Sequence, residues 1–253
     1  MLAIALPMAI QMSAILEFVS TRRMWTAALV TLIFAVLARL VRGVTLSGSL
    51  AGAVVCFVLL ATAGPGAFAV LVLVFVFTWL ATRFGYRRKQ KLGTAERREG
   101  RTASQVVANL AVATVCAALA GLTGKAAFFI AMSAALCEAA ADTVSSELGQ
   151  TQTGYVRLIT TWEVVPVGTD GGVSRMGTAA GVVVSIVVSG GCGLFALLPQ
   201  RELLIPALAG ILGMFIDSYL GAVFERRGVL NNNWVNFFST LAAAGIALLL
   251  TRA

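Results

Sequence analysis

Residues 126–148 read AAFFIAMSAALCEAAADTVSSEL, an apolar stretch interrupted by three acidic residues, Glu138, Asp142 and Glu147. About 20 mostly apolar helical residues span the hydrocarbon core of a bilayer, which is about 30 Å thick. The stretch therefore predicts a membrane-spanning helix. Acidic side chains are costly inside such a helix, and by default they raise the hypothesis of a functional site.

The whole chain has the composition of an integral membrane protein. Of its 253 residues, 59% are hydrophobic and 12% are charged, and the mean hydropathy is +0.92. Soluble domains have about 45–50% apolar and about 25% charged residues. We predict an all-α, polytopic transmembrane helix bundle of eight to nine helices, which forms a single domain over residues 1–253. The apolar segments are 2–16, 25–41, 45–62, 66–82, 105–122, 126–148, 177–198, 203–224 and 235–250.

The first apolar segment, 2–16, is the shortest of the nine, but it lacks the basic region and the cleavage site of a signal peptide. We therefore interpret it as a short or tilted helix. Glycine pairs at four-residue spacing, Gly48 with Gly52 and Gly177 with Gly181, would let helices approach closely. These pairs favour a compact bundle.

The basic residues predict the orientation of the bundle. Lys and Arg number 19 against 11 Asp and Glu, which gives a net charge of +8, and eight of the 19 lie in the polar loop 83–104. Because cytoplasmic loops carry an excess of Lys and Arg, we predict that this loop is cytoplasmic. Alternate crossings then place the glycine-rich loop 149–176 on the same side, with fourteen basic residues inside and five outside. We expect a multi-pass protein of the cell (inner) membrane whose polar site faces the cytoplasm.

Two residue types limit the chemistry. The chain contains no histidine, which excludes a histidine general base, a Ser-His-Asp triad and a histidine-ligated metal. The four cysteines lie far apart within apolar runs and form no CxxC pair, so we interpret them as core residues. Any reaction must use carboxylates, hydroxyls, amides, Lys, Arg or a hard cation.

The acidic residues of two helices are predicted to converge. Glu138 and Asp142 are four residues apart and share a helix face, whereas Glu147 joins them only if the helix ends or turns there. Asp217 occupies a similar position near the cytoplasmic end of segment 203–224. Both helices run toward the cytoplasm in the predicted topology, so we expect these carboxylates to meet near that surface.

Other polar residues fall on the same side of the membrane. Ser145 or Ser146 extends the acidic face, while Asn109 and Asn236 lie at the cytoplasmic starts of segments 105–122 and 235–250. Helix caps and interhelical hydrogen bonds would also explain such groups. Taken together with an excess of Arg and Lys, however, the three carboxylates Glu138, Asp142 and Asp217 suit Mg²⁺ chemistry on phosphates, because Mg²⁺ takes oxygen ligands.

The loop before segment 177–198 reads VGTDGGVSR from residue 167 to residue 175. Its backbone N–H groups, with the following helix N-terminus, could bind an anion. By composition alone, a tight turn into the helix explains the glycines better than an anion site does. The candidate phosphate-binding residues of this loop are Gly168, Thr169, Asp170, Gly171, Gly172, Ser174 and Arg175.

Seven blocks of the sequence closely resemble one known family. It is the polytopic membrane family that includes the plant chloroplast phytyl-phosphate kinase and the animal transmembrane protein 19. The resemblance extends from about residue 39 to residue 250, with the blocks in the same order. They are TRFGYRRKQKLG (82–93), SQVVAN (104–109), DTVSSELG (142–149), RLITT (157–161), VPVGTDGGVS (165–174), DSYLGAVFE (217–225) and NNNWVNFF (231–238).

The resemblance implies a kinase that uses a nucleoside triphosphate, with CTP favoured, to convert phytyl, geranylgeranyl or farnesyl monophosphate into the diphosphate. The prenyl tail of the acceptor would lie between helices or in a groove open to lipid. The expected partners are this acceptor, the nucleotide and membrane lipids, with no nucleic acid, and a homo-oligomer is left open. The candidate metal ligands are Glu138, Asp142, Glu147 and Asp217. Phosphate charge would be neutralised by Lys91, Arg101 and Arg175. The acceptor or the metal-bound waters would be oriented by Asn109, Ser145, Ser146 and Asn236.

Two other functions remain open at the level of the sequence. Acidic residues within a membrane also mark the pathways of transporters and channels, here for a lipid phosphate or an ion. The polar groups nevertheless crowd toward one face, and no path through the bundle is visible in the sequence. A CTP-using prenol kinase or cytidylyltransferase is the further alternative, which its reaction products would distinguish.

Overall fold

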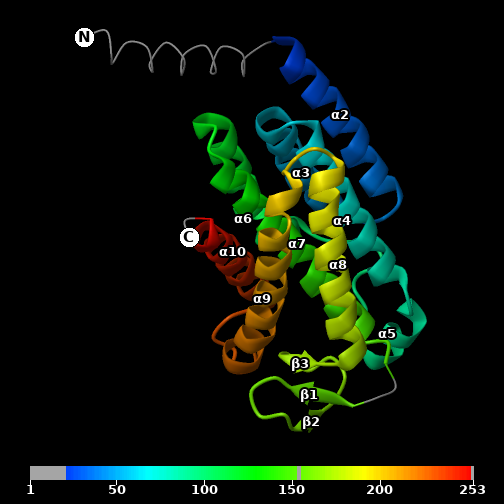
Figure 1. Ribbon diagram of the computed structural model, residues 1–253. Coiled ribbons are helices and arrows are strands. Elements are labelled where there is room, and N and C mark those ends of the chain that lie inside the picture. Colours follow the sequence, from blue (N-terminus) through cyan, green and yellow to red (C-terminus); the bar gives the residue numbers. More distant parts are fainter. Residues whose placement is uncertain (1–20, 153–154, 252–253) are drawn as a thin grey trace.

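The computed structural model describes residues 21–152 and 155–251 and forms a bundle of long helices (Figure 1). Within these ranges, eight helices are long and apolar enough to cross a membrane. They coincide with the last eight apolar segments predicted from the sequence, and the polytopic all-α class is confirmed. The predicted first segment, 2–16, lies outside the described residues.

Most of the helices follow one another with short connections, whereas the connection from α7 to α8 is long and contains three strands. α8 ends at Leu194, four residues before the predicted boundary, because the chain turns at Phe195 and Ala196, the latter with φ of +54°. The helices are α2 (Thr21–Leu40), α3 (Leu46–Val58), α4 (Pro65–Arg83), α5 (Tyr86–Leu92), α6 (Ala103–Thr123), α7 (Ala126–Gly149), α8 (Arg175–Leu194), α9 (Leu204–Leu220) and α10 (Asn232–Leu250), with π turns η1 (Leu59–Ala63) and η3 (Gly221–Glu225) and a 3₁₀ turn η2 (Gln200–Glu202).

α7 is the central helix of the bundle. It packs against α4, α6, α8, α9 and α10, and most of its residues are buried. Glycines of its neighbours make this contact close: a Cβ atom at Gly177 would lie 2.5 Å from the carbonyl oxygen of Ser145, and one at Gly181 would lie 2.9 Å from that of Ala141. The predicted close approach at Gly177 and Gly181 is therefore the packing of α8 on α7.

The other predicted glycine pair has a different role. Gly48 lies directly against the backbone carbonyl of Arg101, which belongs to a loop, whereas a Cβ atom at Gly52 would meet nothing within 4 Å. The prediction of a close helix–helix contact at this pair is wrong, because a loop crosses α3 at Gly48 and open space faces Gly52. The same loop is held by hydrogen bonds from Thr45 N to Arg101 O (2.9 Å) and from Arg101 N to Gly43 O (3.1 Å).

The polar connections lie together at one end of the bundle. α5, the loop after it, and the α9–α10 turn lie at the same end as a small sheet (Figure 1). The sheet has the order β2-β1-β3, with strands β1 (Val156–Leu158), β2 (Val164–Val165) and β3 (Gly172–Val173). The sequence prediction treated 149–176 as a loop. β-branched valines in all three strands suit the sheet instead.

The packing of α9 on α7 predicts the effect of a single methyl group. A Cβ atom at Gly210 of α9 would lie 2.6 Å from Cys137 Cβ and 2.7 Å from Ser185 Oγ. Gly210→Ala should therefore lower the melting temperature of the purified protein, because overpacking a core costs about 1–3 kcal/mol. Gly190→Ala is the control, since a Cβ atom there meets nothing within 4 Å. Equal melting temperatures for the two variants would contradict this packing.

Candidate active site

A polar cavity of about 190 Å³ lies between the ends of α7 and α9 and the glycine-rich loop. The chain has three aspartates, and all three line this cavity. Asp142 comes from α7, Asp217 from α9 and Asp170 from the loop. The other polar side chains of the lining are Ser145, Ser146, Gln150, Thr169, Ser174, Ser218, Glu225 and Asn232.

Asp142 and Asp217 form an acidic pair at the inner end of this cavity. Their side chains interact directly, although they are 75 residues apart in the sequence. Two neighbouring ionised carboxylates repel each other, and a shared proton or cation would relieve that repulsion. The structure therefore brings together the two residues on which the predicted site depends.

Neutral donors surround Asp217. The hydroxyl of Ser239 donates to Asp217 Oδ2 over 3.1 Å. In the amide orientation that satisfies its neighbours, Asn236 donates to the same oxygen over 3.2 Å and accepts from Asn109 Nδ2 over 3.0 Å. A chain of hydrogen bonds thus runs from α6 through α10 to the acidic pair. Sequence reasoning missed Ser239, whose only signal is its place one turn after Asn236.

Glu138 lies one turn deeper on α7 and is almost fully buried. Its Oε1 atom has no hydrogen-bond partner among the described residues. A buried polar atom without a partner is costly, and a proton or a bound cation would remove that cost. In the ranges that the structure describes, no three acidic or cysteine side chains already form a metal-binding group. The arrangement fits Mg²⁺, which binds through one or two carboxylates together with waters and substrate phosphates.

The glycine-rich loop forms the outer wall of the cavity. Gly168 and Gly171 have φ of +88° and +74°, and Gly171 packs directly on Ala222 of η3. The N–H groups of Thr169 and Gly172 are used within the loop. Those of Gly168, Asp170 and Gly171 have no protein partner among the described residues, so they are available to an anion. Ser174 is instead the N-cap of α8, since its hydroxyl accepts from Gly177 N over 3.1 Å.

Asp170 in this loop interacts with nearby charged side chains. The pKa of Asp170 is raised above its ordinary value because the loop partly removes the carboxylate from water, while the positive charge of Arg226 opposes the shift. Asp170 also interacts electrostatically with Glu225 at the end of η3. A cation in the cavity would therefore be attracted from the loop side as well as from the acidic pair.

The predicted basic residues separate into two groups. Arg101 is half-buried; it donates to Thr143 Oγ1 over 3.3 Å and interacts electrostatically with Asp142. Lys91 and Arg175 are exposed and line neither this cavity nor the larger one described below. Lys91 lies in the last turn of a seven-residue helix that turns Lys89 inward instead. The structure thus brings only Arg101 to the acidic pair.

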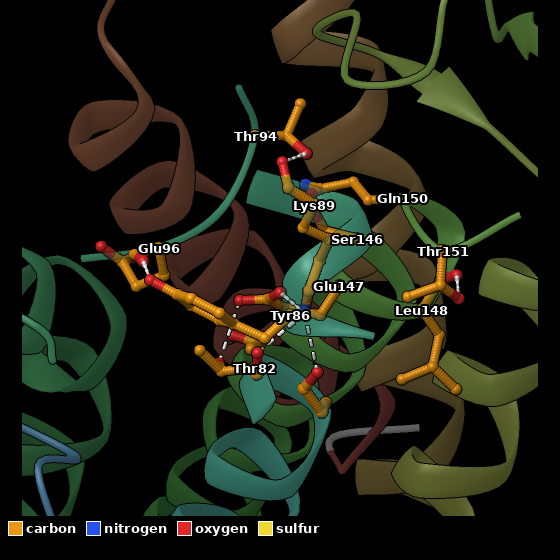
Figure 2. Close-up of polar contacts among 12 residues, drawn as sticks. Thr82, Tyr86, Lys89, Thr94, Glu96, Ser146, Glu147, Leu148, Gln150 and Thr151 are labelled. Atoms are coloured by element: carbon orange, nitrogen blue, oxygen red, sulfur yellow. Dashed lines mark hydrogen bonds and ion pairs between the residues drawn. The ribbon is translucent and has the colours of Figure 1, made fainter. Parts of the chain in front are cut away.

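Glu147, a candidate metal ligand in the sequence, belongs to a separate buried ion pair. Figure 2 shows Lys89 of α5 pointing toward Glu147 and Thr82. Lys89 Nζ lies 2.5 Å from Glu147 Oε2 and donates to the carbonyl oxygens of Ala81 (3.0 Å) and Thr82 (2.8 Å). Thr82 Oγ1 donates to Glu147 Oε1 over 2.9 Å. Both carboxylate oxygens are occupied, so the metal-ligand prediction for Glu147 is wrong.

The structure also contains a larger cavity of about 520 Å³. Residues of α2, α3, α4 and α6 form its apolar interior, and six arginines line it near the polar end of the bundle. Arg101 and Asn109 belong to its wall. Arg101 also interacts electrostatically with Asp142, and Asn109 is hydrogen-bonded through Asn236 to Asp217. Ala139 of α7 lines it too, one turn before Asp142. The two cavities have no lining residue in common, but Arg101 and Asn109 connect the wall of the larger one to the acidic pair.

A bundle of membrane-spanning helices with a polar site at one end defines a multi-pass integral membrane protein. Residues 29–244 match the family described as integral membrane protein DUF92, and the chain belongs to this family. No solved structure matches the chain.

Three relatives illustrate the breadth of the family. An uncharacterized membrane protein of Methanocaldococcus jannaschii is 32% identical over 90% of this chain and 94% of its own. The chloroplast protein VTE6 of Arabidopsis thaliana is 31% identical over 83% of this chain and 66% of its own. The protein PGR of the same plant is 31% identical over 79% of this chain and 86% of its own.

The Lys89–Glu147 pair predicts a characteristic pattern of stability. Lys89→Met and Glu147→Leu should each lower the melting temperature strongly, because an unpaired buried charge costs about 3–5 kcal/mol. The double variant should be more stable than either single variant, since apolar side chains replace a buried pair at little cost. Lys91→Met, on the exposed side of the same helix, is the control. A Glu147→Leu protein with unchanged stability but weaker metal binding would instead restore the sequence-based assignment.

Proposed function

We propose that this protein is an isoprenyl monophosphate kinase. It transfers the γ-phosphoryl group of a nucleoside triphosphate, with CTP favoured, to phytyl, geranylgeranyl or farnesyl monophosphate. One observation carries the proposal: an acidic pair beside a glycine-rich loop is linked through Arg101 and Asn109 to an arginine-lined apolar cavity. A phosphate donor and an amphiphilic phosphate acceptor would meet at this boundary.

The relatives support the same reaction class. The match to the chloroplast protein VTE6 agrees with the resemblance to the family of the chloroplast phytyl-phosphate kinase. The absence of histidine agrees as well. The second pKa of a phosphomonoester is about 6, so the acceptor is already mostly a dianion at neutral pH and needs little help from a general base.

Phosphoryl transfer depends on positioning and on electrostatic stabilisation. An oxygen of the acceptor phosphate attacks the γ-phosphorus, the bond to the bridging oxygen breaks, and the nucleoside diphosphate leaves. Asp142 and Asp217 would hold Mg²⁺, with Glu138 as the deeper carboxylate. Bound there, Mg²⁺ would neutralise charge on the β- and γ-phosphates.

The chain itself supplies the remaining interactions. The N–H groups of Gly168, Asp170 and Gly171 would bind the phosphates of the donor. Arg101 lies beside Asp142 and would attract the acceptor phosphate toward the transferred group. Asn109 and Asn236 fix the orientation of Asp217 through their hydrogen bonds. Ser145 and Ser146 line the donor side and would contact its phosphates or the metal-bound waters.

The basic loop and the polar cavity lie at the same end of the bundle, which supports a cytoplasmic active site in the cell (inner) membrane. Nucleotides would reach such a site directly from the cytoplasm. The isoprenoid would reach it from the membrane, which explains why the kinase is an integral membrane protein.

The kinase reaction predicts specific products. Purified protein given radiolabelled CTP or ATP with a prenyl monophosphate should release the nucleoside diphosphate and form the labelled prenyl diphosphate. Asp142→Asn and Asp217→Asn should each lower kcat by roughly 100-fold or more, the usual loss when a group that stabilises charge in the transition state is removed. Glu163→Gln, at an exposed carboxylate between β1 and β2, should leave kcat unchanged.

Other outcomes would identify the alternatives. Release of pyrophosphate would mean cytidylyl transfer, and labelling of a free prenol would mean a prenol kinase. Flux of a lipid phosphate or an ion through proteoliposomes without nucleotide would favour a transporter. Each of these results would overturn the monophosphate kinase.

The three carboxylates Glu138, Asp142 and Asp217 also predict how activity depends on the metal. EDTA should abolish activity, and added Mg²⁺ should restore it. Glu138→Gln should raise the Mg²⁺ concentration for half-maximal activity by about 10-fold or more, a loss typical of groups that support a metal site. The variant should fold, because Gln has nearly the same size as Glu and Oε1 of Glu138 has no hydrogen-bond partner among the described residues. Full activity in EDTA would remove Mg²⁺ from the mechanism.

A further inference from the structure

The large cavity combines an apolar interior with a basic rim. Its interior includes Phe34, Val55, Leu71 and Val74. The six arginines that line it are Arg42, Arg83, Arg87, Arg97, Arg98 and Arg101. Its volume of about 520 Å³ lies within the range of about 300–1,000 Å³ that is typical of ligand sites. Such a cavity suits an amphiphile with an anionic head and an apolar tail.

None of the six rim arginines forms an ion pair in the described part of the chain. The two ion pairs found in residues 21–152 and 155–251 are Lys89–Glu147 and Arg201–Glu202, so neither includes an arginine of the rim. The carboxylate in the lining, that of Glu96, accepts hydrogen bonds from Gln105 Nε2 (2.7 Å) and Arg97 N (2.9 Å). Unpaired guanidinium groups bind phosphate well, because their fork of donors matches its oxygens.

Part of the rim is held in place. Arg83 donates to the carbonyl oxygen of Val41 over 2.7 Å, and Trp79 Nε1 donates to the same oxygen over 3.1 Å. The guanidinium carbon of Arg83 lies 5.2 Å from the centre of the Trp79 ring. These contacts join α4 to the α2–α3 turn beside the cavity. The rim is therefore organised before a ligand binds, which lowers the entropic cost of binding.

We propose that this cavity holds the isoprenoid tail of the acceptor and that Gly52 sets the longest tail it accepts; this inference rests on the proposed function. Along α4 the lining runs from Arg83 to Leu71, which is about 18 Å at 1.5 Å per residue. The phosphate lies at the arginine end, where Arg101 and Asn109 lead to the acidic pair. The tail extends between the helices toward Leu71 and Val55.

Gly52 is the position on α3 where a side chain would enter this space. Gly48, Ser49, Gly52 and Val55 all line the cavity. At Gly48 the backbone of the loop leaves no room for a side chain, but a Cβ atom at Gly52 meets nothing within 4 Å. Because a Cβ atom there points into open space, a larger residue at Gly52 would take up part of the cavity. The helix would tolerate it, since Gly is less favourable than other residues inside a helix.

Gly52→Leu tests this assignment directly. Binding of radiolabelled farnesyl and geranylgeranyl monophosphate is measured on protein in nanodiscs without nucleotide. The wild-type protein should bind both. Gly52→Leu should weaken geranylgeranyl monophosphate binding by roughly tenfold or more, because a pocket discriminates by about that factor for a single methylene, and should weaken farnesyl monophosphate binding by a smaller factor. Gly190→Leu is the matched control, since Gly190 also faces open space but lies outside the cavity lining.

The outcomes test the binding of the tail in this cavity, called the tail site, separately from the kinase reaction. The tail site is overturned if the wild type binds neither ligand, or if Gly52→Leu binds both as the wild type does or loses both equally. It is also overturned if phosphatidic acid competes as well as geranylgeranyl monophosphate, because the cavity is then a phospholipid site. If binding follows the expected pattern but no nucleotide yields a diphosphate, the tail site stands and the kinase proposal fails.

Discussion

The cost of placing carboxylates inside a membrane protein governs this structure. Asp142 and Asp217 approach each other in a bundle otherwise built from apolar residues, and polar groups in such surroundings must find partners. Ser239 and Asn236 donate to Asp217, and Asn109 holds Asn236. These residues come from α6 and α10, so α10 must pack on α7 and α9, and α6 must pack on α7 and α10. Glycines at the contacts with α8 and α9 permit that packing.

A second buried charge organises the polar end of the bundle. Lys89 and Glu147 tie α5 to the end of α7, with Thr82 and the carbonyl oxygens of α4 completing the hydrogen bonds. This interaction fixes where the basic segment after α4 begins. The arginines that follow then line the large cavity. The ion pair is therefore structural, and it positions residues that we assign to phosphate binding.

The two cavities differ in the chemistry they suit. The polar cavity offers carboxylates and unused backbone N–H groups, which suit a metal ion and the phosphates of a nucleotide. The large cavity offers apolar walls and a basic rim, which suit a lipid with a single phosphate. Arg101 belongs to the wall of the large cavity and acts on Asp142 of the other. A reaction between two phosphates follows naturally from this arrangement.

The sequence by itself determined the eight spanning helices, the collection of polar groups at one end and the pairing of Asp142 with Asp217. Segment length, charge distribution and helical spacing are local properties that can be read along the chain. Tertiary structure alone decided that Glu147 pairs with Lys89, that Lys91 faces away, that Ser239 supports Asp217 and that part of loop 149–176 forms a sheet. Each of these depends on which segments pack together, since a buried polar group is satisfied by a neighbour in space and the sequence does not name that neighbour.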